Sequence, residues 1–134
     1  MTAKEFVALW KMKKDRALEH YLGPRKNSSV AMYISQMKLD QRQKKLLRKM
    51  MDDLLSDTYY ELLLGLDGSR TIGPKQETYM IFGEDGNLIS DCGEIEGEAF
   101  VAFDNGRYLA ASPVDPPEHP KNLHTERWKK RKTE

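Results

Sequence analysis

Apolar residues recur at spacings of three and four over the first 66 residues, which is the period of an amphipathic helix. Thr2 and Glu5 have the spacing of a capping box, so the first helix is expected to begin there and to end at Gly23-Pro24. A second helix is expected after Asn27 or Ser28, either of which can serve as its N-cap. Three helices are therefore predicted within residues 2–66.

The third predicted helix is the longest and carries the widest apolar stripe. It begins at a capping box formed by Asp40 and Gln43 and is stopped by Gly65 and by Asp67-Gly68. Because paired apolar residues recur at every turn, this helix is expected to lie at the centre of the fold. Its basic residues precede its acidic ones, which is the reverse of the order that the helix dipole favours.

The apolar period changes from helical to alternating after residue 77. Residues 78–82 and 88–90 flank a Gly-containing turn, which predicts a β-hairpin. Residues 94–103 also alternate, and a turn signal at residues 104–106 follows them, so two further strands are favoured. Asp91 and Glu94 offer an alternative, because they could cap a short helix in the same stretch.

These patterns predict an α+β fold, in which three N-terminal helices pack on a small antiparallel β-meander. The folded domain is expected to span residues 1–112, with the sheet in residues 77–112. Residues 113–134 are rich in proline and then in basic residues, which predicts a flexible, disordered tail. The predicted core consists of Phe6, Leu9, Trp10, Leu18, Tyr33, Ile34, Leu47, Met50, Leu54, Leu62, Ile81, Ile89, Val101 and Phe103.

Composition points to a cytoplasmic protein with no membrane association. The longest apolar run is far shorter than the roughly 18 residues that cross a bilayer, and the start of the chain does not have the layout of a signal peptide. Cys92 is the single cysteine, so no internal disulfide can form, and a reducing compartment is expected.

Charge is distributed unevenly along the chain although the formal net charge is +1. Residues 1–50 hold thirteen Lys or Arg against four Asp or Glu, whereas residues 51–112 hold three against thirteen. The two halves could neutralise one another on folding, or one of them could meet an oppositely charged partner.

Two sets of charged residues are candidate binding sites. Glu94, Glu96 and Glu98 would share one face of a strand and could bind a basic protein. The alternative is a nucleic-acid site, because basic residues together with an aromatic side chain suit phosphates and bases. Its members would be Arg42, Lys45, Lys49, Trp128, Lys129 and Lys130.

Residues that usually carry chemistry do not form a catalytic, cofactor or metal site in this sequence. The segment 68–75 lacks the Gly-Lys-Ser/Thr of a phosphate loop, and Pro74 removes a backbone donor. His20 suits the C-terminal end of the first helix, and the other two histidines fall in the predicted tail. Cys92 has acidic neighbours, which raise a thiol pKa, so it is interpreted as a turn or core residue.

The helical N-terminal half leads into the segment YELLLGLDG at residues 60–68 and then into a hairpin. Over residues 59–103 this arrangement resembles some small bacterial proteins of unassigned function, which are found in the company of toxin-neutralising immunity proteins. The resemblance implies an immunity-type role and supplies no catalytic residue.

The leading functional hypothesis is a non-enzymatic cytoplasmic module, of the inhibitor or immunity type, that binds a basic protein through its acidic face. The alternative is a nucleic-acid-binding accessory protein that uses its basic helices and basic tail. A small enzyme that works through carboxylates is the third hypothesis.

Overall fold

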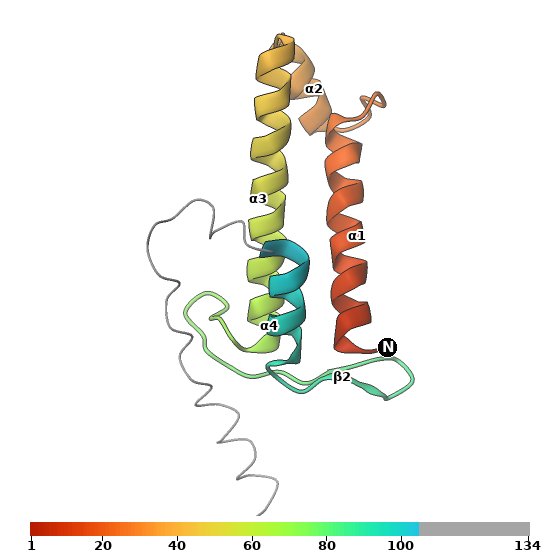
Figure 1. Cartoon of the computed structure of the whole chain (residues 1–134), viewed down its shortest axis with the longest axis vertical. Helices are drawn as coiled ribbons and strands as arrows, with labels where there is room; N and C mark the ends of the chain where they lie inside the picture. The colour runs from red at the N-terminus through yellow and green to blue at the C-terminus, as the bar shows by residue number, and fades with distance from the viewer. Residues whose placement is uncertain (105–134) are drawn as a thin grey trace, which may run out of the picture.

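The computed structural model describes residues 1–104. Two long helices, α1 (Ala3–Leu22) and α3 (Gln41–Asp67), lie side by side and form a helical hairpin (Figure 1). The short helix α2 (Ser29–Gln36) lies at the end of the hairpin where the chain turns from α1 to α3. After α3 the chain forms a small β-hairpin, then helix α4 (Glu94–Ala99) and the π-helix η1 (Phe100–Asp104). These elements lie at the half of the helical hairpin that is opposite α2.

Local capping explains where the three N-terminal helices begin, as predicted. Thr2 and Glu5 form the first capping box, in which the Glu5 amide donates to the Thr2 hydroxyl at 3.2 Å. Asp40 and Gln43 form the second box, with a distance of 2.8 Å between the Gln43 nitrogen and the Asp40 carboxylate. Ser28 is the N-cap of α2 and accepts from the Ala31 amide.

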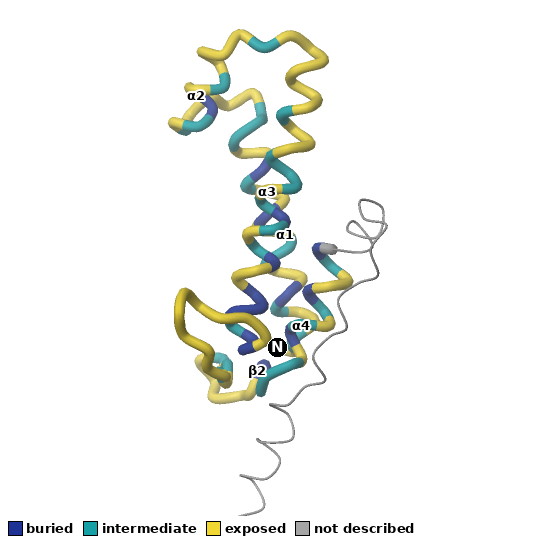
Figure 2. Tube along the Cα trace, turned by 90° about the vertical axis from the view of Figure 1, so that its left-hand side faces the viewer, coloured by how far each residue is buried: buried dark blue, intermediate teal, exposed yellow. Residues whose placement is uncertain are grey.

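The hydrophobic core lies in the half of the hairpin that α4 and η1 cover. Figure 2 shows that buried positions gather there, whereas the half that carries α2 is mostly exposed. Ring contacts extend the core: Trp10 meets Tyr59 edge-on, and Tyr59 stacks on Phe103 of η1 at a centroid distance of 6.4 Å. The buried members of this core are Val7, Tyr60, Leu63, Leu64, Ile95, Ala99 and Phe103.

The α+β class is confirmed, but the sheet is smaller than predicted. Strands β1 (Ile81–Phe82) and β2 (Leu88–Ser90) pair antiparallel, and the turn between them is the predicted one. The prediction of strands over residues 94–103 is wrong, because this stretch forms α4 and η1. The four-stranded meander is therefore replaced, within residues 1–104, by one hairpin and a further helix. The predicted boundary at residues 112–113 lies outside the described residues, as does the tail.

Several predicted core residues are exposed. Leu18, Ile89 and Phe103 are buried, and Phe6, Trp10, Ile34, Leu47 and Ile81 are half-buried. The prediction is wrong for Leu9, Tyr33, Met50, Leu54, Leu62 and Val101, which are all exposed. For Tyr33, Met50 and Leu54 the reason is geometric: toward α2 the structure consists of two long helices and one short one, which leaves part of each apolar surface uncovered. Leu9, Leu62 and Val101 lie in the other half, on the outward sides of their helices.

Candidate functional site

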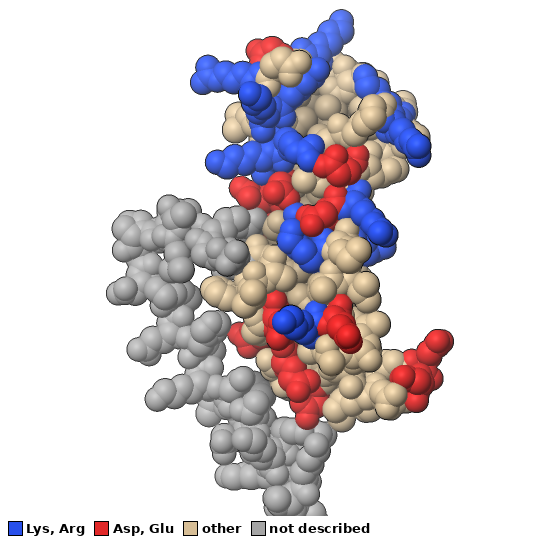
Figure 3. Space-filling model, turned by 45° about the vertical axis from the view of Figure 1, so that its right-hand side comes forward, with Lys and Arg blue, Asp and Glu red and all other residues tan. Residues whose placement is uncertain are grey.

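The fold separates the two signs of charge to opposite ends of the molecule. Residues 16–49, which form the end of α1, the whole of α2 and the start of α3, hold nine Lys or Arg against two Asp or Glu. We call this end the basic tip. Residues 61–104 hold ten Asp or Glu against two Lys or Arg. Figure 3 shows blue side chains gathered over the tip and red ones toward the other end, so a strong local field surrounds each end.

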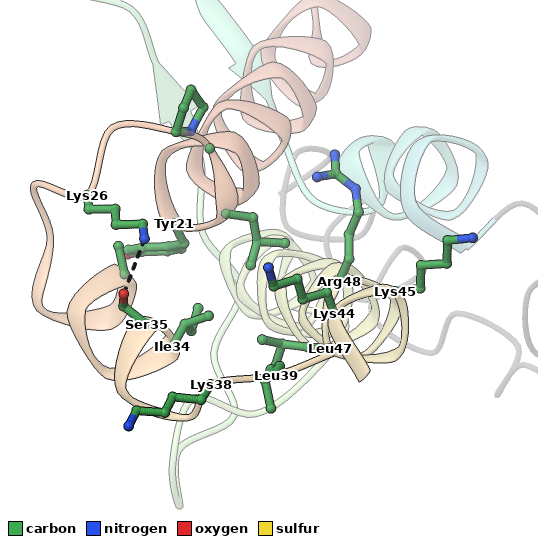
Figure 4. A pocket seen from close by; sticks show the side chains of 14 residues that line it. Tyr21, Lys26, Ile34, Ser35, Lys38, Leu39, Lys44, Lys45, Leu47 and Arg48 are labelled. Atoms are coloured by element: carbon green, nitrogen blue, oxygen red, sulfur yellow. Dashed lines mark hydrogen bonds between the residues drawn. The ribbon is translucent and has the colours of Figure 1, made fainter. Parts of the chain in front are cut away.

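A trough lies in the basic tip between α1, α2 and the start of α3 (Figure 4). Its volume is about 480 Å³. The apolar part of the lining is contributed by Tyr21, Leu22, Ala31, Ile34, Leu39 and Leu47. The polar and basic part is contributed by Lys26, Ser35, Lys38, Lys44, Lys45 and Arg48. The trough therefore combines apolar walls with a rim of cations.

The rim cations come from the loop before α2, the turn after it and the start of α3. Lys26 lies in the loop after α1, and its ammonium donates to the Ser35 hydroxyl of α2 at 3.2 Å. Lys44 and Lys45 lie on the first turns of α3, and Lys45 points away from the trough in Figure 4. Arg48 forms an ion pair with Glu19 of α1, so part of its charge is already compensated.

The predicted nucleic-acid residues are only partly brought together. Arg42, Lys45 and Lys49 are all exposed on the first half of α3, and Lys45 lines the trough. Trp128, Lys129 and Lys130 lie outside the described residues. Sequence reasoning missed Lys26 and the apolar walls, because the spacing within one helix cannot show what another helix brings beside it.

The acidic triad of the sequence prediction does not form a shared face. Glu94, Glu96 and Glu98 lie on α4, where two residues correspond to a rotation of about 200°. Glu94 and Glu98 therefore share one side, and Glu96 points to another, where its carboxylate accepts from the Ser69 hydroxyl at 3.1 Å. The prediction of three parallel carboxylates on a strand is wrong.

An ion cluster of one buried lysine and two half-exposed carboxylates joins α1 to α3 between the basic tip and the core. The Lys14 side chain is 2% exposed, and its ammonium lies 2.5 Å from Asp52 and 2.9 Å from Asp15. Burial opposes the charged form of Lys14, but the two carboxylates outweigh it and raise its pKa. A lysine whose pKa is raised stays protonated, so this cluster has a structural role and does not supply a nucleophile.

A second buried carboxylate, Asp67, holds the start of α4. It is 1% exposed and accepts from the backbone amides of Gly93, Ile95 and Glu96 at 2.9–3.2 Å. The Ser69 hydroxyl lies 2.9 Å from the same carboxylate and shares its one proton between Asp67 and Glu96. The N-cap of α4 is Gly93, which has no side chain, so Asp67 caps this helix from the end of α3.

Cys92 lies in the turn between β2 and α4 and is half-buried. Burial raises the pKa of its thiol, and the charges of Asp67, Asp91 and Glu96 raise it further. A thiol of this kind stays protonated near neutral pH, which disfavours nucleophilic catalysis. The structure therefore agrees with its interpretation as a turn residue.

The part of the chain that the structure describes holds neither a metal-binding cluster nor a membrane-spanning helix. Across residues 1–104, no group of three or more His, Cys, Asp or Glu side chains is placed to hold a metal ion. In the same part of the chain, no helix is both long enough and apolar enough to cross a membrane. Comparison of the chain with protein-family models, with curated proteins and with solved structures finds no match.

Proposed function

We propose that the protein is a non-enzymatic nucleic-acid-binding accessory module that uses the basic tip to contact the phosphate backbone. The observation that carries this proposal is the convergence of cations from the segments before and after α2 and from the start of α3 on one end of the molecule. Side chains from several elements span more of a phosphate backbone than one helical face can. The proposal keeps the cytoplasmic setting expected from the single cysteine.

The physical basis of binding would be electrostatic. Phosphate contacts by Lys and Arg release condensed counterions, so affinity falls as salt rises. If about five tip cations contact phosphates, log K should fall with log salt at a slope of about −4 to −5 on duplex DNA. An acidic protein partner would give a shallower dependence, because protein surfaces carry no comparable counterion layer.

The test compares two triple charge-reversal variants, one in the basic tip and one away from it. In the tip variant Lys26, Lys44 and Lys45 become glutamate, and in the control variant Lys4, Arg70 and Lys75 become glutamate. Lys4 lies in the first turn of α1, and Arg70 and Lys75 follow α3, so all three lie away from the tip. Both variants change the net charge equally and alter exposed side chains, and each removes only exposed polar contacts: the Lys26–Ser35 hydrogen bond in one, and the Arg70–Glu61 and Lys75–Glu77 ion pairs in the other.

Binding of labelled single-stranded and duplex DNA is measured by fluorescence anisotropy at two salt concentrations. We expect the tip variant to lose at least about tenfold in affinity and to have a salt slope that is smaller by about three. The control variant should change by less than about threefold. Equal losses in both variants, or wild-type binding that salt does not affect, would contradict the proposal.

A second candidate is capture of a basic protein by the acidic end, favoured by the excess of carboxylates in residues 61–104. The support for this candidate is weaker, because only two of the three predicted carboxylates, those of Glu94 and Glu98, lie on the same side of α4. The triple change of Glu94, Glu96 and Glu98 to lysine separates the two candidates. It should abolish capture of a basic partner under this candidate, and it should tighten nucleic-acid binding under the first one.

A further inference from the structure

An uncovered apolar ridge runs along the first half of α3. Leu46, Met50 and Leu54 are spaced four residues apart, so they follow one another on one side of the helix. Their exposed fractions are 68%, 58% and 62%. Single exposed leucines are common on protein surfaces, but three large apolar side chains in a row form a patch that water solvates poorly.

This ridge faces away from the described partners of α3. In the same half of the helix, Arg48 pairs with Glu19 and Asp52 pairs with Lys14, so those positions face α1. Helix α4 and η1 pack lower on α3, where Phe103 stacks on Tyr59. In Figure 1 the upper half of α3 has α1 on one side and no described element on the other. Within residues 1–104 the ridge is therefore uncovered.

The charges beside the ridge change sign along its length. Arg42 and Lys49 lie next to its N-terminal part, and Asp53, Asp57 and Glu61 lie next to its C-terminal part and beyond it. The helix dipole favours the reverse order, and a Lys four residues before an Asp is the weaker orientation of such a pair. The stability of the isolated helix therefore does not explain this arrangement.

We propose that a second copy of this chain packs antiparallel along α3, ridge against ridge. A surface that is positive at one end and negative at the other is complementary to itself when one copy is reversed. With the two-fold axis near residue 52, Met50 meets Leu54 of the second copy, and Lys49 lies near its Asp57. Arg42 lies near its Glu61, a carboxylate that is exposed and also forms a 3.8 Å ion pair with Arg70 of its own chain. A parallel arrangement would bring like charges together, and the acidic half would repel a nucleic acid.

This interface overlaps the basic tip at Arg42 and Lys49, which the second copy would partly neutralise. The tip lysines that the nucleic-acid experiment changes are not the residues invoked at the ridge. In the antiparallel pair the two basic tips lie at opposite ends, so the trough side of each tip remains open. The test reads the molecular mass in the absence of nucleic acid, and failure of one proposal leaves the other unaffected.

The first experiment measures the mass of the full chain by sedimentation at about 1–200 µM, where a small helical interface is expected to associate. The wild type should shift from monomer to dimer in this range. Met50→Lys should weaken self-association at least tenfold. Met12→Lys is the matched control, because Met12 lies on α1 and is 50% exposed, and it should leave the association unchanged. A wild type that stays monomeric, or equal effects of the two substitutions, would overturn the proposal.

The second experiment exchanges the charges. Arg42→Glu with Lys49→Glu makes the surface acidic throughout, and Asp57→Lys with Glu61→Lys makes it basic throughout. Each double variant should self-associate at least tenfold more weakly than the wild type, whereas an equimolar mixture of the two should form a heterodimer. The chain that carries all four changes is complementary to itself again and should regain the dimer. Loss of association in the mixture and in the fourfold variant, with helix content preserved by circular dichroism, would overturn the antiparallel arrangement.

Discussion

Removal of the Asp67 carboxylate is expected to loosen the whole C-terminal part of the fold. This carboxylate is the acceptor for three backbone amides at the start of α4 and for the Ser69 hydroxyl. Since α4 supplies Ile95 and Ala99 to the core, the polar contact and the apolar packing depend on each other. Asp67→Ala would leave those amides without their acceptor in a buried place.

The size of the effect follows from the number of amides. A buried donor that loses its acceptor costs about 1–3 kcal/mol, but only the Ile95 hydrogen bond is fully buried and those of Gly93 and Glu96 are part-buried, so we expect a total of about 3–5 kcal/mol. A domain of this size has a free energy of unfolding of about 5–15 kcal/mol, so the loss is a large share of it. Asp67→Asn keeps the shape and one acceptor oxygen, and we expect it to cost about 2–3 kcal/mol.

Urea unfolding followed by circular dichroism measures these free energies, and amide hydrogen exchange locates the effect. Exchange at Ile95 and Glu96 should accelerate more than exchange at the amides of α1. Asp85→Ala is the control, because Asp85 also accepts hydrogen bonds but is exposed in the β-turn, and it should cost less than about 1 kcal/mol. A cost below about 1 kcal/mol for Asp67→Ala would refute the assignment of Asp67 as the cap of α4.

Two further predictions concern the backbone and the thiol. Gly68→Ala should lower the free energy of unfolding by about 1–3 kcal/mol more than Gly86→Ala, although both residues have positive φ. A Cβ at Gly68 would approach the Glu77 carbonyl oxygen to 2.9 Å, whereas a Cβ at Gly86 would meet nothing within 4 Å. Equal losses in urea unfolding would contradict this reading. The pH at which Cys92 reaches its half-maximal rate of alkylation by iodoacetamide should lie above that of a short cysteine peptide, because the thiolate reacts and burial raises the thiol pKa. A midpoint equal to or below that of the peptide would show that neither burial nor the nearby carboxylates act on the thiol.

The beginnings of the N-terminal helices could be predicted because their signals are local. Thr2 with Glu5 and Asp40 with Gln43 satisfy amides within three residues, and the β-turn with Gly86 is equally short in range. Such interactions depend on residue types that are adjacent in the sequence. Their formation does not depend on the structure of the rest of the chain.

Residues 94–104 were mispredicted because the decisive contact is distant in sequence. Gly93 begins α4 in the left-handed region at φ 90°, and it has no side chain with which to cap the helix. The capping carboxylate comes from Asp67, which lies 28 residues before Ile95. The apolar residues of this stretch are equally compatible with a helix, in which Ile95 and Ala99 are the two buried positions.

The candidate site could be predicted in part. The excess of positive charge in residues 1–50 located the basic end, and Lys45 was placed correctly on an exposed face of a helix. The trough depends on how α2 packs between α1 and α3, and the burial of Lys14 depends on Asp52 lying opposite it. These are consequences of helix packing, which apolar periodicity does not specify in detail.

The contact between Lys14 and Asp52 also determines the axial alignment of the two long helices. Apolar packing between the two helices alone would let α3 slide along α1 by one turn with little loss of contact. A slide of four residues in one direction would bring Lys14 opposite Arg48, and a slide in the other would bring it opposite Ser56. Either slide would separate Lys14 from Asp52 and leave it with Asp15 alone, and the first would also place two cations together, so both are penalised. The position of α2, and with it the shape of the trough, therefore depends on ion pairs between the two long helices that lie outside α2.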